Sequence, residues 1–376
     1  MVLLKANTEL MESPYTRLKD ILPLETPLTL MIDPANRCNF RCTFCPTGDY
    51  ELLESVKRPI GMMDFDLFCK IIDDLAEFPE KVKSLRLYKD GEPFLNRNIV
   101  KMIVYAKKKD VAEEIYIISN GSAITENIAL GIIEAGLDRL RISIEHVNSE
   151  KYKEITRTYS NYEMIVKNVR FLYQEKQKRK SPLHINAKIV DTGLSKGDME
   201  KFENDFGNIT DSLNVETLMG WSKSMEKDWT LGSNPRTGID GKSKLKEIQI
   251  CPQPFKGLAI NFDGTASVCC VDWSHGTIVG DLKKESLMDI WNGPKLREFR
   301  LLHLMKQRHK IPVCANCQYI KGHNPLSHLD NESESLIKIY SNGEAISEQR
   351  LDEIAESFNN NGKNNGVNIS LKNLKI

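Results

Sequence analysis

Short apolar runs alternate with amphipathic stretches along the first part of the chain. Each run spans four to eight residues and is rich in aliphatic or β-branched side chains, which is typical of a strand. Strands are predicted at residues 27–33, 84–88, 114–119, 139–145, 184–190 and 212–219. Helical spacing of apolar residues predicts helices near residues 64–78, 98–110, 125–135 and 161–179. This alternation predicts an α/β fold with a parallel sheet. Because a closed barrel needs eight such units, we expect a partial, TIM-like (βα)6 barrel.

The pattern changes after residue 221. Residues 222–244 are polar and rich in Gly, Ser and Pro, and short strands around Gly264 precede helices near residues 286–306. From residue 328 the chain is polar and ends near the run NNNGKNNGVN, for which we expect a largely flexible tail. The predicted organisation is an N-terminal extension (1–26), a barrel (27–221), a linker with a small second domain (222–327) and a C-terminal tail (328–376).

Composition narrows the class of protein. The 376 residues are 40% hydrophobic, which is sufficient for a core, and 52 Lys and Arg balance 52 Asp and Glu. A net charge of zero argues against nucleic-acid binding through a basic field. The chain has no run of 18 apolar residues, and charge appears early, at Lys5 and Glu9, which disfavours a secretory signal. We therefore expect a cytoplasmic protein that binds neither nucleic acid nor membrane.

The chain has nine cysteines, and three of them form the spacing C-x3-C-x2-C directly after the first predicted strand, at Cys38, Cys42 and Cys45. Structural disulfides are rare in a reducing compartment, so metal ligation is the favoured interpretation. Thiolates select iron–sulfur clusters or zinc. Three thiolates leave one iron of a 4Fe–4S cluster open, and the loops after parallel strands are where active sites form. A structural zinc site with a distant fourth ligand is the alternative.

This cysteine loop after the first strand of a (βα)6 barrel resembles the radical S-adenosylmethionine (SAM) superfamily. The resemblance implies that SAM chelates the open iron and is cleaved to methionine and a 5′-deoxyadenosyl radical. It also implies an external one-electron donor of the flavodoxin or ferredoxin type.

Further matches to the superfamily follow in chain order. Gly91-Glu92-Pro93 is similar to the GGE motif, with Asp90 in place of its first glycine, and Ser119-Asn120-Gly121 is similar to TNG. Ser143, followed by Glu145, is similar to an S-x-D element. The residues implied to contact SAM are Phe44, Gly91, Glu92, Asn120, Ser143 and Arg157.

A second cysteine group lies about 200 residues later, at Cys251, Cys269, Cys314 and Cys317. Four thiolates can ligate a second 4Fe–4S cluster completely. The spacing C-x12-G-x4-C followed by CxxC resembles the first half of the SPASM domain, whose short form is the twitch domain. A full SPASM domain carries further cysteines, whereas His323 stands at the next such position here, so the resemblance implies one auxiliary cluster. A four-cysteine zinc site is the alternative, and Cys270 could replace Cys269 as a ligand.

A fully ligated second cluster has no open iron, so its expected role is electron transfer. That role suits oxidation of a secondary alcohol, and the cluster arrangement resembles the 2-deoxy-scyllo-inosamine dehydrogenase type. We therefore expect a small polar substrate, a sugar or aminocyclitol, either free or carrier-linked. Strand alternation points polar side chains inward. Among these, Tyr88, Lys188 and Glu216 are candidates to accept the hydroxyl proton. The alternatives are a radical SAM enzyme that modifies a peptide, a redox-neutral sugar epimerase with Cys270 as hydrogen donor, and a zinc-stabilised scaffold protein.

Overall fold

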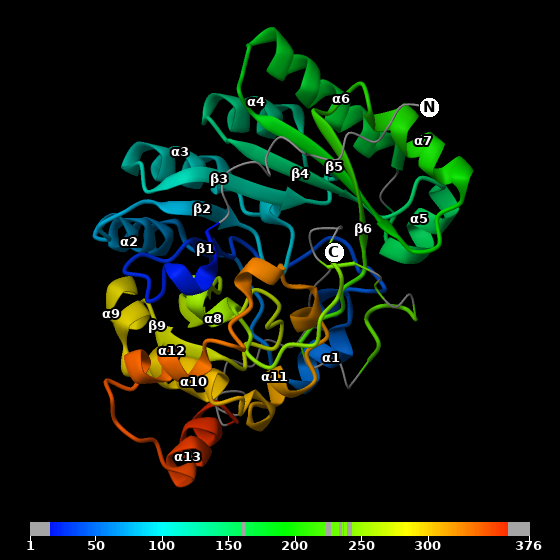
Figure 1. Cartoon of the computed structure of the whole chain (residues 1–376). Coiled ribbons are helices and arrows are strands. Elements are labelled where there is room, and N and C mark those ends of the chain that lie inside the picture. Colours follow the sequence, from blue (N-terminus) through cyan, green and yellow to red (C-terminus); the bar gives the residue numbers. More distant parts are fainter. Residues whose placement is uncertain are drawn as a thin grey trace.

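The six predicted strands are present and pair in parallel, each beside the next along the chain. The expected α/β fold with an open, partial barrel is confirmed (Figure 1). The computed structural model describes residues 16–159, 162–222, 227–232, 235, 237–238 and 243–359. The strands are β1 (Thr29–Ile32), β2 (Val82–Leu87), β3 (Ala112–Ser119), β4 (Arg139–Ile144), β5 (His184–Asp191) and β6 (Ser212–Thr217).

Helices cover the outer face of these strands (Figure 1). Their first turns are held by side-chain caps: Asp64 accepts hydrogen bonds from the backbone of α2, and Ser195 and Asp198 form a capping box at α7. Their apolar stripes pack on the outward residues of the strands, such as Ile185 and Ile189, which are fully buried. The helices are α1 (Tyr50–Ser55), α2 (Phe65–Ala76), α3 (Ile99–Lys109), α4 (Glu126–Glu134), α5 (Ser149–Thr156), α6 (Tyr162–Lys178) and α7 (Lys196–Phe206).

The sheet does not end at β1. Strand β7 (Gly257–Ile260) pairs in parallel with β1, and β8 (Thr265–Ser267) and β9 (Ile278–Asp281) follow in antiparallel order, giving nine strands in one sheet. A β-carbon at Gly257 would lie 2.0 Å from the carbonyl oxygen of Thr29, so only glycine allows this pairing. The cysteine-bearing second domain is therefore built onto the edge of the barrel sheet.

The prediction of a flexible tail from residue 328 is wrong for residues 328–359. Two helices form there, and they pack on α10. The aromatic rings of Phe299 and Phe358 meet edge to face with centroids 4.9 Å apart, and those of Phe255 and Tyr340 lie 5.5 Å apart. Residues 1–15 of the predicted extension and 360–376 of the predicted tail lie outside the described residues. The helices of this half are α8 (Gln253–Lys256), α9 (Leu287–Asn292), α10 (Pro294–Leu304), α11 (Pro312–Ala315), α12 (Ser333–Tyr340) and α13 (Glu348–Asn359).

Short 3-10 helices connect several of these elements. They are η1 (Leu18–Asp20), η2 (Pro46–Gly48), η3 (Pro93–Leu95), η5 (Arg308–Lys310), η6 (Tyr319–Gly322) and η7 (Pro325–Ser327).

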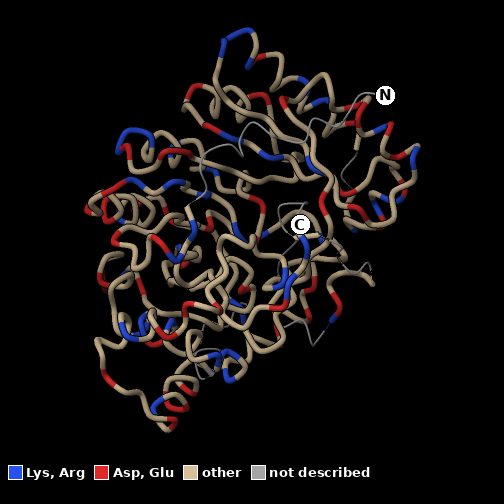
Figure 2. Tube along the Cα trace, viewed as in Figure 1, with Lys and Arg blue, Asp and Glu red and all other residues tan. Residues whose placement is uncertain are grey.

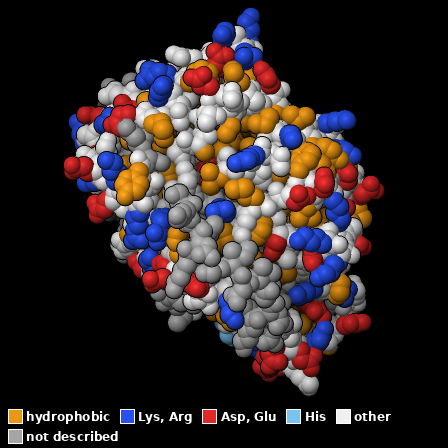
Figure 3. All heavy atoms as spheres, turned by 180° about the vertical axis from the view of Figure 1, so that it is seen from behind, with side chains coloured by type: hydrophobic (Ala, Val, Ile, Leu, Met, Phe, Trp, Pro, Cys, Tyr) orange, Lys and Arg blue, Asp and Glu red, His pale blue; other side chains and the backbone are white. Residues whose placement is uncertain are grey.

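Charged side chains of both signs are mixed along the chain and over the surface (Figures 2 and 3). This mixing agrees with the formal net charge of zero. Among the described residues, no helix combines the length and the hydropathy that crossing a membrane requires.

Candidate functional site

The first cysteine group lies in the loop that joins β1 to α1. The loop backbone is fixed against the end of α5, because the amides of Arg41 and Thr43 donate to the carbonyls of Thr156 and Ile155 at 2.8 and 2.9 Å. Burial raises the pKa of each of the three thiols, and their mutual repulsion adds to the shift of Cys42. Thiols in such surroundings ionise when a positively charged metal centre is present. The three side chains therefore fit a metal or cluster as partner.

Among the described residues, no three donor side chains converge on the position of a single ion. A cubane cluster does not need such convergence, since each cysteine binds a different iron. A donor set made only of thiolates suits an iron–sulfur cluster.

Gly91 and Glu92 tie the end of β2 to this cysteine loop. The amide of Glu92 donates to the carbonyl of Arg37 at 2.9 Å, and a β-carbon on Gly91 would lie only 2.3 Å from that oxygen. The Glu92 carboxylate accepts hydrogen bonds from the Ser119 hydroxyl and from the backbone N–H of Asn120, both at 2.8 Å. Burial nevertheless raises the pKa of Glu92 to about 7. Glu92 thus links the loops that follow β1, β2 and β3.

Asn120 extends this link to the cysteines. Its Nδ2 lies 3.9 Å from Cys38 Sγ and 2.9 Å from Asn39 Oδ1. Phe44 is buried against Val190 and Leu218 on the other side of the loop, and its carbonyl accepts a hydrogen bond from Trp221 Nε1 at 3.0 Å. The sequence contained no motif that pointed to Trp221.

The other two expected SAM contacts lie on neighbouring elements. Ser143 is partly buried on β4, in register with Lys188 of β5. Arg157 ends α5 in a left-handed conformation with φ of 51°, and its side chain is exposed. Because residues 155 and 156 pair with the cysteine loop, Arg157 is placed at the edge of that loop.

The candidate proton acceptors occupy the inner face of the sheet, where two of the three form one cluster. Glu216 Oε1 lies 2.6 Å from Arg141 Nη2, and Glu216 Oε2 lies 3.7 Å from Lys188 Nζ. Tyr88 packs edge to face on Tyr116, with ring centroids 5.4 Å apart, and the charge of Arg141 reaches both phenols. Sequence reasoning missed Arg141, although alternation on the strand RLRISIE puts it on the same face as Ser143.

The second cysteine group surrounds a small cavity. Cys251, Cys269, Cys314 and Cys317 all line it, together with apolar side chains such as Val268 and Ile320. Burial raises the pKa of Cys251, Cys314 and Cys317, as in the first group. Four thiols around one largely apolar cavity could hold a fully ligated cluster.

Two further residues lie beside cysteines of this group without lining the cavity. His323 Nε2 lies 3.9 Å from Cys251 Sγ, and burial lowers the pKa of this histidine to about 3, so the ring is neutral. Cys270 is not part of the cavity lining and interacts instead with Arg86 and Lys256. Contact with Cys269, followed by the charges of Arg86 and Lys256, lowers the pKa of Cys270 to about 7.

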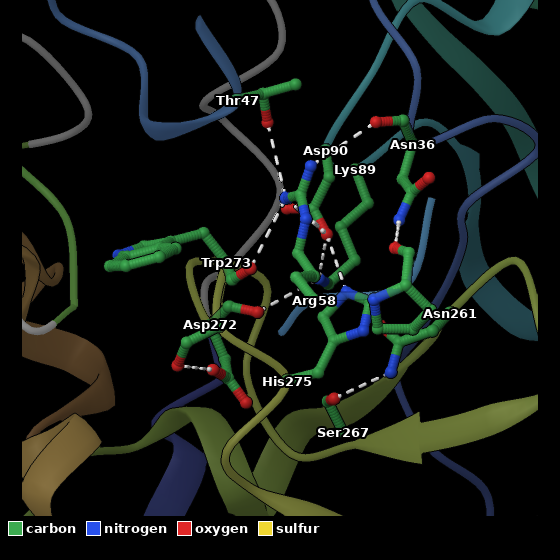
Figure 4. A network of polar contacts seen from close by, with 12 residues as sticks. Asn36, Thr47, Arg58, Lys89, Asp90, Asn261, Ser267, Asp272, Trp273 and His275 are labelled. Carbon is green, nitrogen blue, oxygen red and sulfur yellow. Dashed lines mark hydrogen bonds and ion pairs between the residues drawn. The ribbon is translucent and has the colours of Figure 1, made fainter. Parts of the chain in front are cut away.

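A buried network of charges connects the two cysteine-bearing regions (Figure 4). Arg58 donates to the Thr47 hydroxyl, next to the first cysteine loop, and to the carbonyl of Trp273, which follows Cys269 and Cys270. Lys89 likewise donates to the carbonyl of Asp272 at 3.1 Å. Both cations surround Asp90, whose carboxylate also accepts a hydrogen bond from His275 Nε2 at 3.0 Å.

Burial opposes ionisation of Asp90, but Lys89, His275 and Arg58 hold its pKa below the usual range. Asp90 is the residue that replaces the first glycine of the GGE-like motif. Its side chain therefore has a structural explanation here: it is the central anion between the two regions.

Comparison with protein families agrees with this geometry. Residues 32–195 match the radical SAM superfamily, and residues 251–318 match SPASM, an iron–sulfur cluster-binding domain. The chain therefore carries a radical SAM domain followed by a SPASM domain. The first domain implies SAM and a 4Fe–4S cluster, and the second implies auxiliary iron–sulfur binding.

Curated relatives match only part of the chain. A GTP 3′,8-cyclase of Brucella ovis is 30% identical over 151 residues, which is 36% of this chain and 41% of that protein. The tungsten-containing aldehyde ferredoxin oxidoreductase cofactor-modifying protein of Pyrococcus furiosus is 33% identical over 116 residues, or 31% and 30% of the two chains. The chain thus spans about a third of the length of these relatives.

Comparisons with solved structures cover more of the chain, and the first two below share its fold. SuiB of Streptococcus suis, bound to the precursor peptide SuiA, superposes with a TM-score of 0.56 at 14% identity, covering 81% of this chain and 72% of that one. The native anSMEcpe with bound AdoMet gives 0.55 at 15% identity, covering 88% and 100%. BtrN in complex with AdoMet and 2-DOIA gives 0.46 at 17% identity, covering 77% and 92%.

Proposed function

We propose that this radical SAM enzyme oxidises a secondary alcohol of a hydroxylated substrate, with the auxiliary cluster as electron acceptor. The observation that carries the proposal is the closed set of four cysteines around one cavity, Cys251, Cys269, Cys314 and Cys317. A cluster ligated by all four has no coordination site for substrate, which leaves electron transfer as its chemical role.

The proposal assigns ligands to both clusters. Cys38, Cys42 and Cys45 hold the cluster that binds SAM, and the four cysteines of the second group hold the auxiliary cluster. The proposed SAM contacts are Phe44, Gly91, Glu92, Asn120, Ser143 and Arg157. When bound, SAM and the two clusters would supply the redox chemistry: a hydrogen-atom acceptor derived from SAM, which would become 5′-deoxyadenosine, and an auxiliary cluster able to take the remaining electron.

The chain's own part in the reaction is to hold the hydroxyl group and to take its proton. Of the three candidates, Glu216 is the best placed acceptor, because its carboxylate lies on the inner face and is oriented by Arg141 at 2.6 Å. The looser contact of its second oxygen with Lys188, at 3.7 Å, leaves an acceptor position for a substrate hydroxyl. Tyr88 is less suited, since burial raises the pKa of its phenol.

The test separates hydrogen abstraction from oxidation. A panel of sugars and aminocyclitols deuterated at their carbinol carbons is given to the reconstituted enzyme, and deuterium in 5′-deoxyadenosine is measured by mass spectrometry. For the substrate so identified, a Cys314→Ala/Cys317→Ala variant should still transfer deuterium and should form no ketone. Iron analysis provides the control: about eight irons in the wild type and about four in the variant. Ketone formation by the variant, or loss of deuterium transfer, would contradict an electron-acceptor role.

A redox-neutral epimerisation is the second candidate, and the position of Cys270 favours it. This thiol lies outside the lining of the auxiliary cavity and close to Arg86 of the inner face. A thiol there could return a hydrogen atom to a substrate radical, and the auxiliary cluster would then supply the electron that, with a solvent proton, restores the thiol. In deuterated water an epimerase would place solvent deuterium on carbon, and Cys270→Ala would abolish that incorporation, whereas a dehydrogenase would form ketone in both cases.

A further inference from the structure

His303 of α10 is a buried histidine, and neither of its ring nitrogens has a hydrogen-bond partner among the described residues. Its side chain is 1% exposed. Burial, followed by the charge of Arg308, lowers the pKa of His303 to about 3, so the ring is neutral and carries one N–H donor. A buried donor without an acceptor costs free energy, and such a group normally indicates a partner that is not part of the chain.

The ring of His303 lines the auxiliary cavity. Its neighbours in that lining include the four proposed cluster ligands, Cys251, Cys269, Cys314 and Cys317. Two other polar side chains of the lining already have partners. The Ser222 hydroxyl donates to the carbonyl of Val271 at 2.6 Å, and Arg308 donates to the carbonyl of Cys314. The unpaired imidazole therefore borders the space that the four thiols surround.

The fold holds this imidazole in one position. His303 lies one helical turn after Phe299, and the two rings stack with centroids 4.8 Å apart and an angle of 25° between their planes. The helix is anchored in turn by Arg300, whose buried guanidinium donates to the carbonyls of Pro254 at 3.0 Å and Trp291 at 3.3 Å. A side chain locked by packing on a rigid helix can meet a group in the cavity without reorganisation.

We propose that the N–H of His303 donates a hydrogen bond to a sulfur atom of the auxiliary cluster and thereby raises the reduction potential of that cluster. Hydrogen bonds to the sulfurs help to set the potential of an iron–sulfur cluster, because they stabilise its more negatively charged, reduced state. The inference rests on the proposed function, namely on the four-cysteine ligand set and the electron-acceptor role. A higher potential makes the cluster a better acceptor for the electron that leaves the substrate.

Direct binding of iron by His303 is the competing explanation, since imidazole is also a metal ligand. The four cysteines already supply one thiolate for each iron of a 4Fe–4S cluster, so the imidazole would have to displace one of them. His323 differs in position, because its Nε2 lies 3.9 Å from Cys251 Sγ and its side chain does not line the cavity. His323 can therefore interact with one ligand, whereas His303 borders the space for the cluster itself.

The experiment measures the auxiliary cluster without turnover. Reconstituted enzyme is titrated with a reductant under EPR, and the signal that stays unchanged when SAM is added belongs to the closed cluster. His303→Phe keeps the aromatic stack on Phe299 and loses the N–H. We expect it to make reduction of this cluster about tenfold less favourable, which lowers the midpoint potential by about 59 mV. His303→Gln keeps an N–H donor and should recover part of the shift. His309→Phe is the matched control, because this histidine of η5 is exposed, and the potential should stay at the wild-type value.

A second measurement detects the hydrogen bond itself. The N–H proton exchanges with solvent, so deuterated water should remove a proton coupling from the ENDOR spectrum of the reduced auxiliary cluster. His303→Phe should remove the same coupling while it keeps the wild-type iron content. If His303→Phe does not fold, His303→Leu replaces it in both measurements.

Three outcomes would overturn the proposal. The first is an equal midpoint potential in the wild type and His303→Phe. The second is an exchangeable coupling that survives the substitution, which would assign the proton to a water molecule. The third is loss of about four irons in His303→Phe together with a strong nitrogen coupling in the wild type, which would make His303 a ligand.

Failure of the proposed function would be recognised separately. If no alcohol of the deuterated panel is oxidised while His303→Phe still lowers the midpoint potential, only the dehydrogenation is refuted and the hydrogen bond stands. A wild type with about four irons and no signal from a closed cluster would refute the four-cysteine ligand set and this proposal together.

Discussion

Asp33 follows β1 with both carboxylate oxygens buried and neither in a normal hydrogen bond. Burial, followed by the charge of Asp90, raises its pKa to about 7, although Lys89 and Arg58 oppose the shift. The two carboxyls therefore differ sharply: Asp90 is the ionised centre of the network in Figure 4, and Asp33 exchanges its proton near neutral pH. The buried carboxyl of Asp33 therefore makes the free energy of unfolding depend on pH.

The sign of that dependence follows from linkage. The folded state holds the Asp33 proton up to about pH 7, while the unfolded chain releases it near the ordinary pKa of 3.8. The proton on Asp33 therefore contributes its full stabilisation of the folded state below about pH 4, and this contribution is lost as the pH rises to about 7. We expect Asp33→Asn to flatten the melting temperature between pH 5 and 7. The exposed Asp352→Asn serves as control and should keep the wild-type slope; a wild-type slope in Asp33→Asn would contradict the assignment.

At the scale of elements, periodicity alone located all six barrel strands and the helices α2, α3, α4 and α6, whereas α1, α5 and α7 were not predicted. The parts that could not be predicted depend on tertiary partners. Short strands were expected around Gly264, but the pairing of β7 with β1 was not, because it joins residues more than 200 positions apart. The helices α12 and α13 were missed because their polar composition outweighed the helical spacing of a few apolar residues, such as Leu336 and Tyr340.

The last helix should consequently contribute to stability in a measurable way. Phe358 of α13 is 3% exposed and packs on Phe299 of α10. We expect Phe358→Ala to lower the free energy of unfolding by about 3 kcal/mol, as for other buried aromatic truncations. Tyr159→Ala is the control, since that side chain is fully exposed and its removal should change little. The free energies of unfolding of both variants are measured by denaturant unfolding. If Phe358→Ala is as stable as the Tyr159→Ala control, α13 does not pack as described.

For the whole molecule, the local cysteine spacing predicted both cluster-bearing regions, but not how they are connected. The side chains that join them come from segments far apart in sequence, Arg58 after α1, Lys89 after β2 and His275 after β8. None of the three belongs to a motif, so only the assembled fold brings them together. The connection is buried and charged, which makes it intolerant of losing one partner.

Arg58 is the residue through which this intolerance can be tested. Its guanidinium donates to Thr47 on one side and to the Trp273 carbonyl on the other, and it lies 3.7 Å from Asp90 with no exposed surface. Removing its charge leaves the Asp90 carboxylate with fewer cations to balance it and breaks the hydrogen bonds to the Thr47 and Trp273 segments at once. In the presence of an iron chelator, Arg58→Gln should therefore release iron from both clusters faster than the wild type. Mössbauer spectra taken during release separate the two clusters, whose ligand sets differ. Arg350→Gln, which breaks only exposed ion pairs, should release iron at the wild-type rate. Faster loss from the first cluster alone would mean that Arg58 supports its own loop and does not couple the two halves.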